Sequence, residues 1–173
     1  MKRIVIASVI GFATLTAGCT GTIGEAKPDP TNSSSTSADS SKLASIKPCD
    51  LLTKTEATSL GYSYPGEDSN IGTANGCDWV ISGKGGTSVG IRAKSGVKDL
   101  DLKGDKVSET TIGKFSGSKV EAPDGDKGAC SIVIGVTESS SVSVISTTGA
   151  SLDVSAACER AAKVADLVAQ KLS

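Results

Sequence analysis

The sequence predicts an α+β domain with an antiparallel sheet of about five or six strands. A short N-terminal helix and a long C-terminal helix flank this sheet, and two disulfides hold it. Apolar and polar residues alternate in short runs between residues 77 and 147, as in half-buried strands. Helical spacing appears on either side, at residues 54–60 and 154–172. Four cysteines accompany these segments: Cys49, Cys77, Cys130 and Cys158.

The first 19 residues have the pattern of an export signal with a lipid-attachment site. Lys2 and Arg3 form a positive start, residues 4–15 are mostly apolar, and small residues directly precede Cys19. An apolar run of about a dozen residues is too short to span a bilayer. We expect residues 1–18 to be a signal peptide cut before Cys19, whose thiol then carries diacylglycerol, with palmitate among the acyl chains. The alternatives are an ordinary secretory signal and a retained membrane anchor.

Residues 19–47 are predicted to be the lipidated cysteine followed by a disordered tether. No apolar periodicity is present there, and eight of the twelve residues from Thr31 to Lys42 are Ser or Thr. Such a tract cannot bury enough apolar surface to offset its ordering entropy. Residues 48–173 then form a single disulfide-stabilised domain.

Charge and composition exclude several classes of function. Loss of Lys2 and Arg3 with the signal would leave 16 basic and 19 acidic residues, a net charge of −3, so nothing suggests a nucleic-acid partner. The chain has no histidine, which removes the commonest general base and metal ligand. We expect no cofactor and no metal site.

The four later cysteines are expected to form structural bridges. They allow three connectivities, and no C-x-x-C pair suggests a redox or zinc site. In an exported chain, well-separated cysteines oxidise. Sequential pairing would close two loops of 28 positions each. In the chain-entropy model each such bridge is worth roughly 3 to 4 kcal/mol. The alternating segments hold few aromatic residues, so the bridges would compensate for a core built from small aliphatic side chains.

The N-terminal helix is predicted over residues 54–60. Thr53 and Glu56 fit a capping box, and Gly61 fits the position after the helix end. The glycine- and proline-containing stretch 62–76 indicates a loop.

Five strands follow from alternation of apolar residues, and glycine-rich or acidic turns separate them. Residues 97–103 fit either a short helix or a loop. The predicted strands are 77–81, 87–93, 114–122, 129–136 and 141–147.

The C-terminal helix is predicted over residues 154–172. Asp153 is its candidate N-cap. Apolar residues from Cys158 to Leu172 recur at helical spacing and charged residues occupy the other faces. The helix should therefore pack on one face of the sheet.

Several local patterns resemble those of a known family. They are Pro48-Cys49-Asp50-Leu51-Leu52-Thr53, Glu56-Ala57, Leu60-Gly61, Cys77-Asp78-Trp79, Ile112-Gly113-Lys114-Phe115, Cys130 before an alternating strand, and Cys158 in the last helix. In these features the chain is similar to small actinobacterial envelope lipoproteins known as domain of unknown function 3558. The resemblance implies export, lipidation and disulfides Cys49–Cys77 and Cys130–Cys158. It implies no activity and no catalytic residues. More loosely, Mog1- and PsbP-like folds suggest an antiparallel sheet flanked by helices.

Two motifs invite a chemical interpretation. Residues 99–104 begin like a calcium loop, but Lys103 and Thr110 stand where ligands would be needed. Ser116 and Lys119 fit S-x-x-K, as do Ser95 and Lys98, yet no partner motif accompanies either pair. A charged turn and chance are the simpler explanations.

Other candidates also have a structural explanation. Gly83–Gly86 lacks the spacing of a phosphate loop and suits a hairpin turn. Trp79 on a strand beside a cysteine is expected in the core. The carboxylates of Glu56, Asp68 and Asp78 show no spacing that would define an acid and base pair.

We therefore expect a lipid-anchored cell-envelope protein on the outer side of the cell membrane, acting as a non-catalytic binding or accessory module. Its partner would be an envelope protein, a glycan or a lipid. The alternatives are a lipid or small-molecule carrier with an apolar cavity between sheet and helix, and a carboxylate- or serine-based envelope hydrolase.

Overall fold

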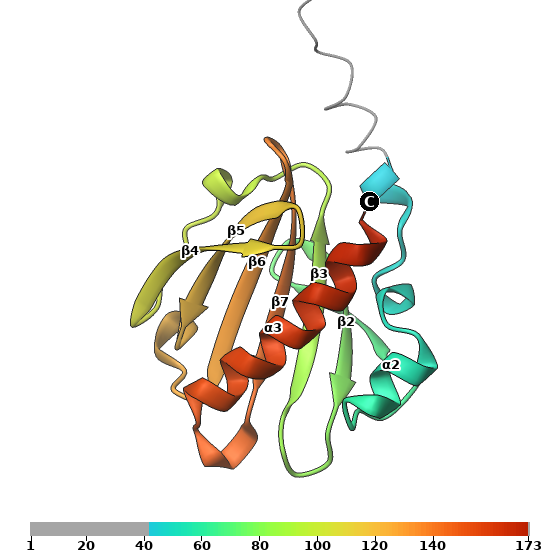
Figure 1. The fold of residues 1–173 in the computed structure, drawn as a ribbon, viewed down its shortest axis with the longest axis vertical. Coiled ribbons are helices and arrows are strands. Elements are labelled where there is room, and N and C mark those ends of the chain that lie inside the picture. The colour runs from blue at the N-terminus through green and yellow to red at the C-terminus, as the bar shows by residue number, and fades with distance from the viewer. Residues whose placement is uncertain (1–41, 173) are drawn as a thin grey trace, which may run out of the picture. The chain divides into compact units, whose positions relative to one another are not determined.

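The structure is a computed structural model that describes residues 42–172, which fall within one compact unit. Its centre is a seven-stranded antiparallel sheet in the order β1-β2-β3-β7-β6-β5-β4, with α2 and α3 on the same face (Figure 1). The strands are β1 (Glu67–Ile71), β2 (Ala74–Val80), β3 (Gly86–Arg92), β4 (Lys106–Ile112), β5 (Phe115–Glu121), β6 (Ala129–Thr137) and β7 (Ser140–Thr147). The helical segments are η1 (Pro48–Leu51), α2 (Lys54–Ser59), η2 (Val97–Asp99), η3 (Pro123–Gly125), η4 (Gly149–Ser151) and α3 (Val154–Lys171). No helix within residues 42–172 has the length and apolar character needed to cross a membrane.

The α+β class and the flanking helices are confirmed, but the sheet has seven strands instead of five or six. The additional strands, β1 and β4, are its two edges. β1 lies in the stretch predicted as a loop, and its sequence Glu-Asp-Ser-Asn-Ile lacks apolar alternation. Most β4 residues are at least partly exposed. An edge strand pairs on one side only, so polar sequences form it without the periodicity that marks interior strands.

The short helix α2 begins at the predicted capping box. Glu56 N donates to Thr53 Oγ1 over 3.3 Å, and Thr53 N donates to Glu56 Oε2 over 2.7 Å. Gly61, with φ of 83°, takes the chain out of the helix. The helix ends at Ser59, one residue before the predicted end.

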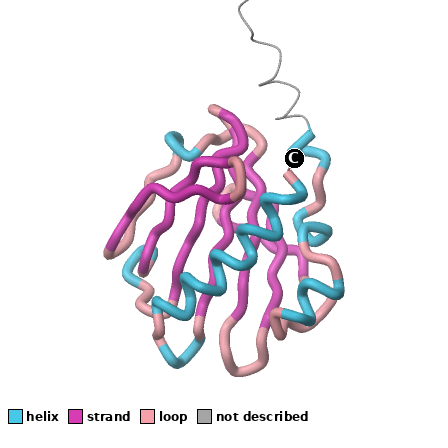
Figure 2. The backbone as a smooth tube through the Cα atoms, viewed as in Figure 1, coloured by secondary structure: helices cyan, strands magenta, loops and turns pink. Residues whose placement is uncertain are grey.

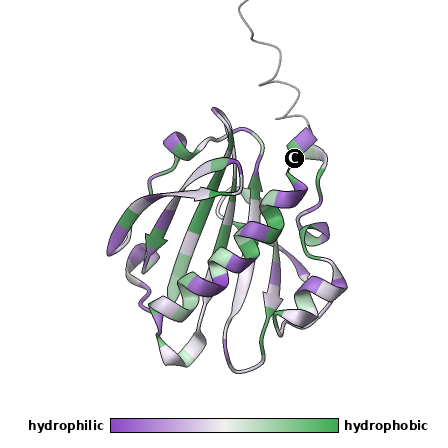
Figure 3. Cartoon of the chain, viewed as in Figure 1, coloured by the Kyte–Doolittle hydropathy of each residue, from purple (hydrophilic) through white to green (hydrophobic). Residues whose placement is uncertain are grey.

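The long helix α3 lies across β6 and β7 (Figures 1 and 2). Asp153 is its N-cap, as predicted, and accepts a hydrogen bond from Ala156 N over 3.0 Å. Polar residues lie along its outward side (Figure 3). The side that meets the sheet is built from small side chains that are all buried: Ala157, Ala161, Val164, Ala165, Val168 and Ala169.

The strand register shows which residues lie on the helix-covered face of the sheet. Ile91 in β3 is opposite Val142 in β7, which is opposite Ile134 in β6. The last two are fully buried under α3, as are Val89 and Val144 in the next row. Side chains therefore fill the space between α3 and the sheet.

One chain of hydroxyl groups interrupts this apolar core. Thr87 Oγ1 lies 2.5 Å from the Tyr62 hydroxyl and 2.6 Å from Ser146 Oγ, and all three residues are buried. Burial raises the pKa of Tyr62. The hydroxyls satisfy one another, which is the condition for burying them without a large penalty.

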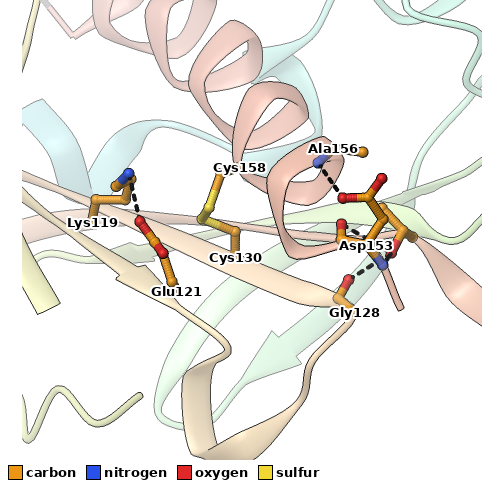
Figure 4. The surroundings of a disulfide bond; sticks show 8 residues. Lys119, Glu121, Gly128, Cys130, Asp153, Ala156 and Cys158 are labelled. Atoms are coloured by element: carbon orange, nitrogen blue, oxygen red, sulfur yellow. Dashed lines mark hydrogen bonds and ion pairs between the residues drawn. A yellow bond between two sulfur atoms is a disulfide. The ribbon is translucent and has the colours of Figure 1, made fainter. Parts of the chain in front are cut away.

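Both predicted disulfides are present, with the pairing that the family resemblance implied. Cys49 in η1 is bonded to Cys77 in β2, and Cys130 in β6 is bonded to Cys158 in α3. Figure 4 shows the second bridge beneath the first turns of α3. Each bridge joins a helical segment to an interior strand of the sheet.

Candidate functional site

The face of the sheet opposite α2 and α3, here called the open face, has small residues at its centre. Gly76 is opposite Gly90, and Gly90 is opposite Ser143. The side chain of Ile71 lies over both glycines, because a Cβ atom added to either would lie within about 3.1 Å of Ile71 Cδ1. The glycines therefore make room for Ile71, which forms a wall on this face.

Residues 93–105, which connect β3 to β4, form a crossover over the open face. Asp124 N donates to Lys103 O over 3.2 Å and fixes one end of the crossover. Between the crossover and the sheet is a cavity of about 270 Å³, here called the Arg92 cavity. It is lined by Ile71, Arg92, Leu100, Asp101, Leu102, Lys103, Val120, Pro123, Asp124, Ser131, Val133, Ser143 and Ile145.

Two cations line this cavity, Arg92 and Lys103, and Arg92 is the one without an ion-pair partner. Its Nη1 donates to Ser143 Oγ over 2.8 Å and its Nη2 donates to Ile71 O over 3.0 Å. None of the ion pairs among residues 42–172 includes it. Burial lowers the pKa of Arg92, and no carboxylate offsets this effect. A half-buried guanidinium without an anionic partner is a site that favours an anion.

Ser131 provides a second polar group in the floor of the Arg92 cavity. It is 93% buried, since its exposed fraction is 7%. It lies between Val120 and Ile145 on the neighbouring strands. Its hydroxyl forms no hydrogen bond in the described part of the chain, whereas Ser143 is engaged by Arg92.

Lys103 partly offsets the charge of the two carboxylates at the rim of the cavity, Asp101 and Asp124. Asp101 forms an ion pair with Lys103, and Asp124 adds to the raised pKa of Lys103 after the larger effect of Asp101. Asp99, the first residue of the possible calcium loop, accepts a hydrogen bond from Gly96 N over 2.8 Å. No group of three or more potential metal ligands occurs among residues 42–172.

The S-x-x-K pair of Ser116 and Lys119 is divided between the two faces of the sheet. Residues three apart on a strand point to opposite sides. Lys119 lies on the helix-covered side and pairs with Glu121 over 2.8 Å, near the Cys130–Cys158 bridge (Figure 4). Ser116 lies on the open face. The pair cannot act as a serine and lysine dyad in this arrangement.

The second S-x-x-K pair is also occupied by structural contacts. Ser95 O accepts a hydrogen bond from Ser141 Oγ over 2.7 Å. Lys98 pairs with Glu138 over 2.9 Å. These contacts anchor the start of the crossover.

The remaining predicted candidates are dispersed. Glu56 serves the capping box and pairs with Lys171. Asp68 Oδ1 lies 3.3 Å from Cys49 Sγ, a disulfide sulfur with no proton to donate. Asp78 is opposite Glu67 in β1. Trp79 is 1% exposed and belongs to the core, as expected. The fold does not bring these carboxylates together.

The glycine-rich segment 83–86 forms the β2–β3 turn, as predicted. Gly85, with φ of 83°, approaches the strand end so closely that a Cβ atom would lie 2.2 Å from Thr147 O. Arg160 of α3 also donates to Thr147 O and to Lys84 O. The turn is therefore packed against the domain and does not form a phosphate-binding loop.

Two of the other depressions in the described part of the chain are more open than the Arg92 cavity. One, of about 320 Å³, lies beside the β2–β3 turn, and Asp78 at its edge has a buried Oδ1 without a hydrogen-bond partner. A groove of about 930 Å³ lies at the β4–β5 hairpin. Lys98 in this groove is paired with Glu138, and Lys114 lies 5.3 Å from the Phe115 ring centre. Lys98 in the larger groove thus has an anionic partner in the domain, whereas Arg92 is hydrogen-bonded only to neutral groups.

Sequence reasoning missed Arg92. The residue is next to last in the predicted strand 87–93, within Ile91-Arg92-Ala93, and nothing in this pattern shows that the following segment folds back over its side chain. An arginine on the open side of a central strand, next to Gly90, was the available signal. The predicted lipidation site, Cys19, lies outside the described residues.

A family model described as "Protein of unknown function (DUF3558)" matches residues 14–171 of the chain. The match covers most of the sequence, so the chain belongs to this family. No curated protein and no solved structure shows significant similarity to it.

Proposed function

We propose that this member of the DUF3558 family is a lipid-anchored, extracytoplasmic binding module without catalytic activity, attached to the cell membrane through Cys19. The pattern of residues 1–19 supports the anchor. The two disulfides support an oxidising compartment, because structural bridges persist there and are rare in the cytosol.

The observation that carries the binding role is the Arg92 cavity on the open face. The helix-covered face is filled by its own side chains, which disfavours a carrier cavity between sheet and helix. The open face instead combines a cation that has no anionic partner with a cavity lined by both polar and apolar side chains. We therefore place the ligand or partner on that face.

Cell fractionation tests the anchor. The natural chain should sediment with membranes, and Cys19→Ala should be released from them, because the substitution removes the thiol that would carry the lipid. Ser34→Ala, a change of similar size in the tether sequence, is the control and should leave sedimentation unchanged. Retention of Cys19→Ala in the membrane fraction would refute lipid anchoring at this residue.

In-cell photocrosslinking tests the binding face. A photoreactive residue at Val107, which is 47% exposed on the open face, should form adducts with an envelope protein, glycan or lipid. The same residue at the exposed position Lys163 on α3 is the matched control. Equal adducts from the two positions would remove the argument for the open face.

A further inference from the structure

We infer that the Arg92 cavity binds a small organic anion, with its carboxylate or phosphate group on Arg92 and its short apolar chain beneath the crossover, where Ser131 offers a further hydroxyl. This inference rests on the proposed binding function and names the ligand class. It does not depend on where the protein resides.

The polar end of the site is defined by hydrogen-bonding capacity. A guanidinium has five N–H donors, and two of its nitrogens, Nη1 and Nη2, are each shown donating one bond. Ser131 adds a hydroxyl that has no partner in the described chain. An oxyanion bound to Arg92 would supply the negative charge that this half-buried side chain lacks, and Ser131 offers a further donor to a polar group elsewhere on the ligand.

The apolar end is defined by the walls of the cavity. Leu100 and Leu102 of the crossover line the cavity together with Val120, Val133 and Ile145 of the sheet. A ligand chain placed there would be removed from water on both sides. Each buried CH₂ group would tighten binding about fourfold.

The volume limits the ligand to a small molecule. At roughly 30 Å³ for each water-sized group, a cavity of about 270 Å³ matches a ligand of the size of hexanoate. Asp101 and Asp124 at the rim disfavour a ligand with several negative charges, although Lys103 partly offsets them.

Ligand binding can be measured directly by titration calorimetry. The protein is the full chain carrying Cys19→Ala, purified without detergent. The probes are hexanoate, hexyl phosphate, acetate and hexanol. Hexanoate or hexyl phosphate should bind, while acetate and hexanol, which lack the chain or the charge, should bind at least tenfold more weakly. Absence of binding by both six-carbon anions would overturn the inference.

Three substitutions locate the site. Arg92→Gln should weaken binding of the anion at least tenfold, and Ser131→Ala should weaken it several-fold. Lys94→Gln, which removes one positive charge at the neighbouring exposed position, should leave binding unchanged. Equal affinity in the natural chain and Arg92→Gln would refute the site.

A cavity-filling variant separates charge from shape. Ser131→Leu adds apolar volume to the floor of the cavity and should abolish binding while Arg92 is still present. The melting temperature of Ser131→Leu reports whether this variant is folded. If it is not folded, the affinity of Ser131→Ala still shows whether the Ser131 hydroxyl contributes to binding. Co-sedimentation with phosphatidylglycerol vesicles that depended on Arg92 would contradict the small soluble ligand. If these experiments contradict the inferred ligand, the proposed function is not thereby refuted. The Cys19 fractionation and the Val107 crosslinking test that function separately.

Discussion

Lys171 at the end of α3 forms an ion pair with Glu56 of α2, across 115 positions of the sequence. The same ammonium donates to Leu51 O over 2.7 Å. Both side chains are about one-quarter exposed. The C-terminal residue of one helix thus fixes the N-terminal helical segments to the rest of the domain.

Lys171→Met should lower the free energy of unfolding by about 1–2 kcal/mol, because it leaves Glu56 without its cation and Leu51 O without this donor. Urea denaturation measures the change. Lys163→Met, on the exposed side of the same helix, should change stability by less than about 0.5 kcal/mol. Similar losses in the two variants would mean that the ion pair contributes nothing specific.

Glu56 predicts a response to acid. Burial alone raises its pKa, but hydrogen bonds from Lys171 and Thr53 outweigh this effect and lower the pKa below the ordinary value of 4.5. Its stabilising contribution is therefore present above pH 4.5 and is lost as the pH falls through the lower folded-state pKa. Glu56→Gln should be less stable than the natural chain at pH 7, and the gap should close in acid. A gap that stays constant down to pH 2 would contradict this linkage.

The two disulfides should contribute similar stability, since each has a sequence separation of 28 residues. In the chain-entropy model each loop is worth about 3–4 kcal/mol. Cys49→Ala with Cys77→Ala, and Cys130→Ala with Cys158→Ala, should each lower the unfolding free energy by that amount. A loss below about 1 kcal/mol for either pair would show that its bridge does not constrain the unfolded chain.

Thr87→Val should destabilise the domain by about 1–3 kcal/mol, because it removes the hydroxyl that hydrogen-bonds to both Tyr62 and Ser146 in the core. Thr111→Val makes the same change at an exposed strand position and should be nearly neutral. Thermal unfolding of the two variants gives the comparison. Equal melting temperatures would show that the hydroxyl chain is not energetically coupled.

Gly85→Ala should cost more stability than Gly83→Ala. Both glycines have positive φ, so both substitutions strain the backbone by roughly 1 kcal/mol. Only at Gly85 would the new Cβ atom also collide with a backbone carbonyl, that of Thr147. We expect a further loss of at least about 2 kcal/mol for Gly85→Ala, measured by urea denaturation. Matching losses would mean that the turn moves away freely.

The interior strands and the long helix could be predicted from the sequence, because burial of one face requires apolar residues at a regular spacing. The strand from Ala129, with Cys130, Ile132 and Ile134 on one face, and the helix from Val154 are examples. The capping box at Thr53 added a local signal that depends on only four residues. The edge strands β1 and β4 lack this apolar spacing, so the sequence did not predict them.

The candidate site was harder to predict because it depends on a long-range contact. Residues 97–103 have a weak local preference, and their position over Ser131 and Ser143 is set by the strand order, in which β4 lies at the far edge from β3. Two serines on separate strands and one arginine become neighbours only after the crossover closes over them. No spacing in the sequence encodes that arrangement.

The Cys49–Cys77 bridge also determines how mechanical tension passes through the protein. It closes residues 50–76 into a covalent loop. A pull on the chain preceding Cys49 is therefore transmitted through the sulfur atoms to β2, and α2 and β1 stay unloaded. β2 is hydrogen-bonded on both sides, to β1 and β3. The force therefore acts on an interior strand, which can leave the sheet only if its hydrogen bonds to both neighbouring strands break.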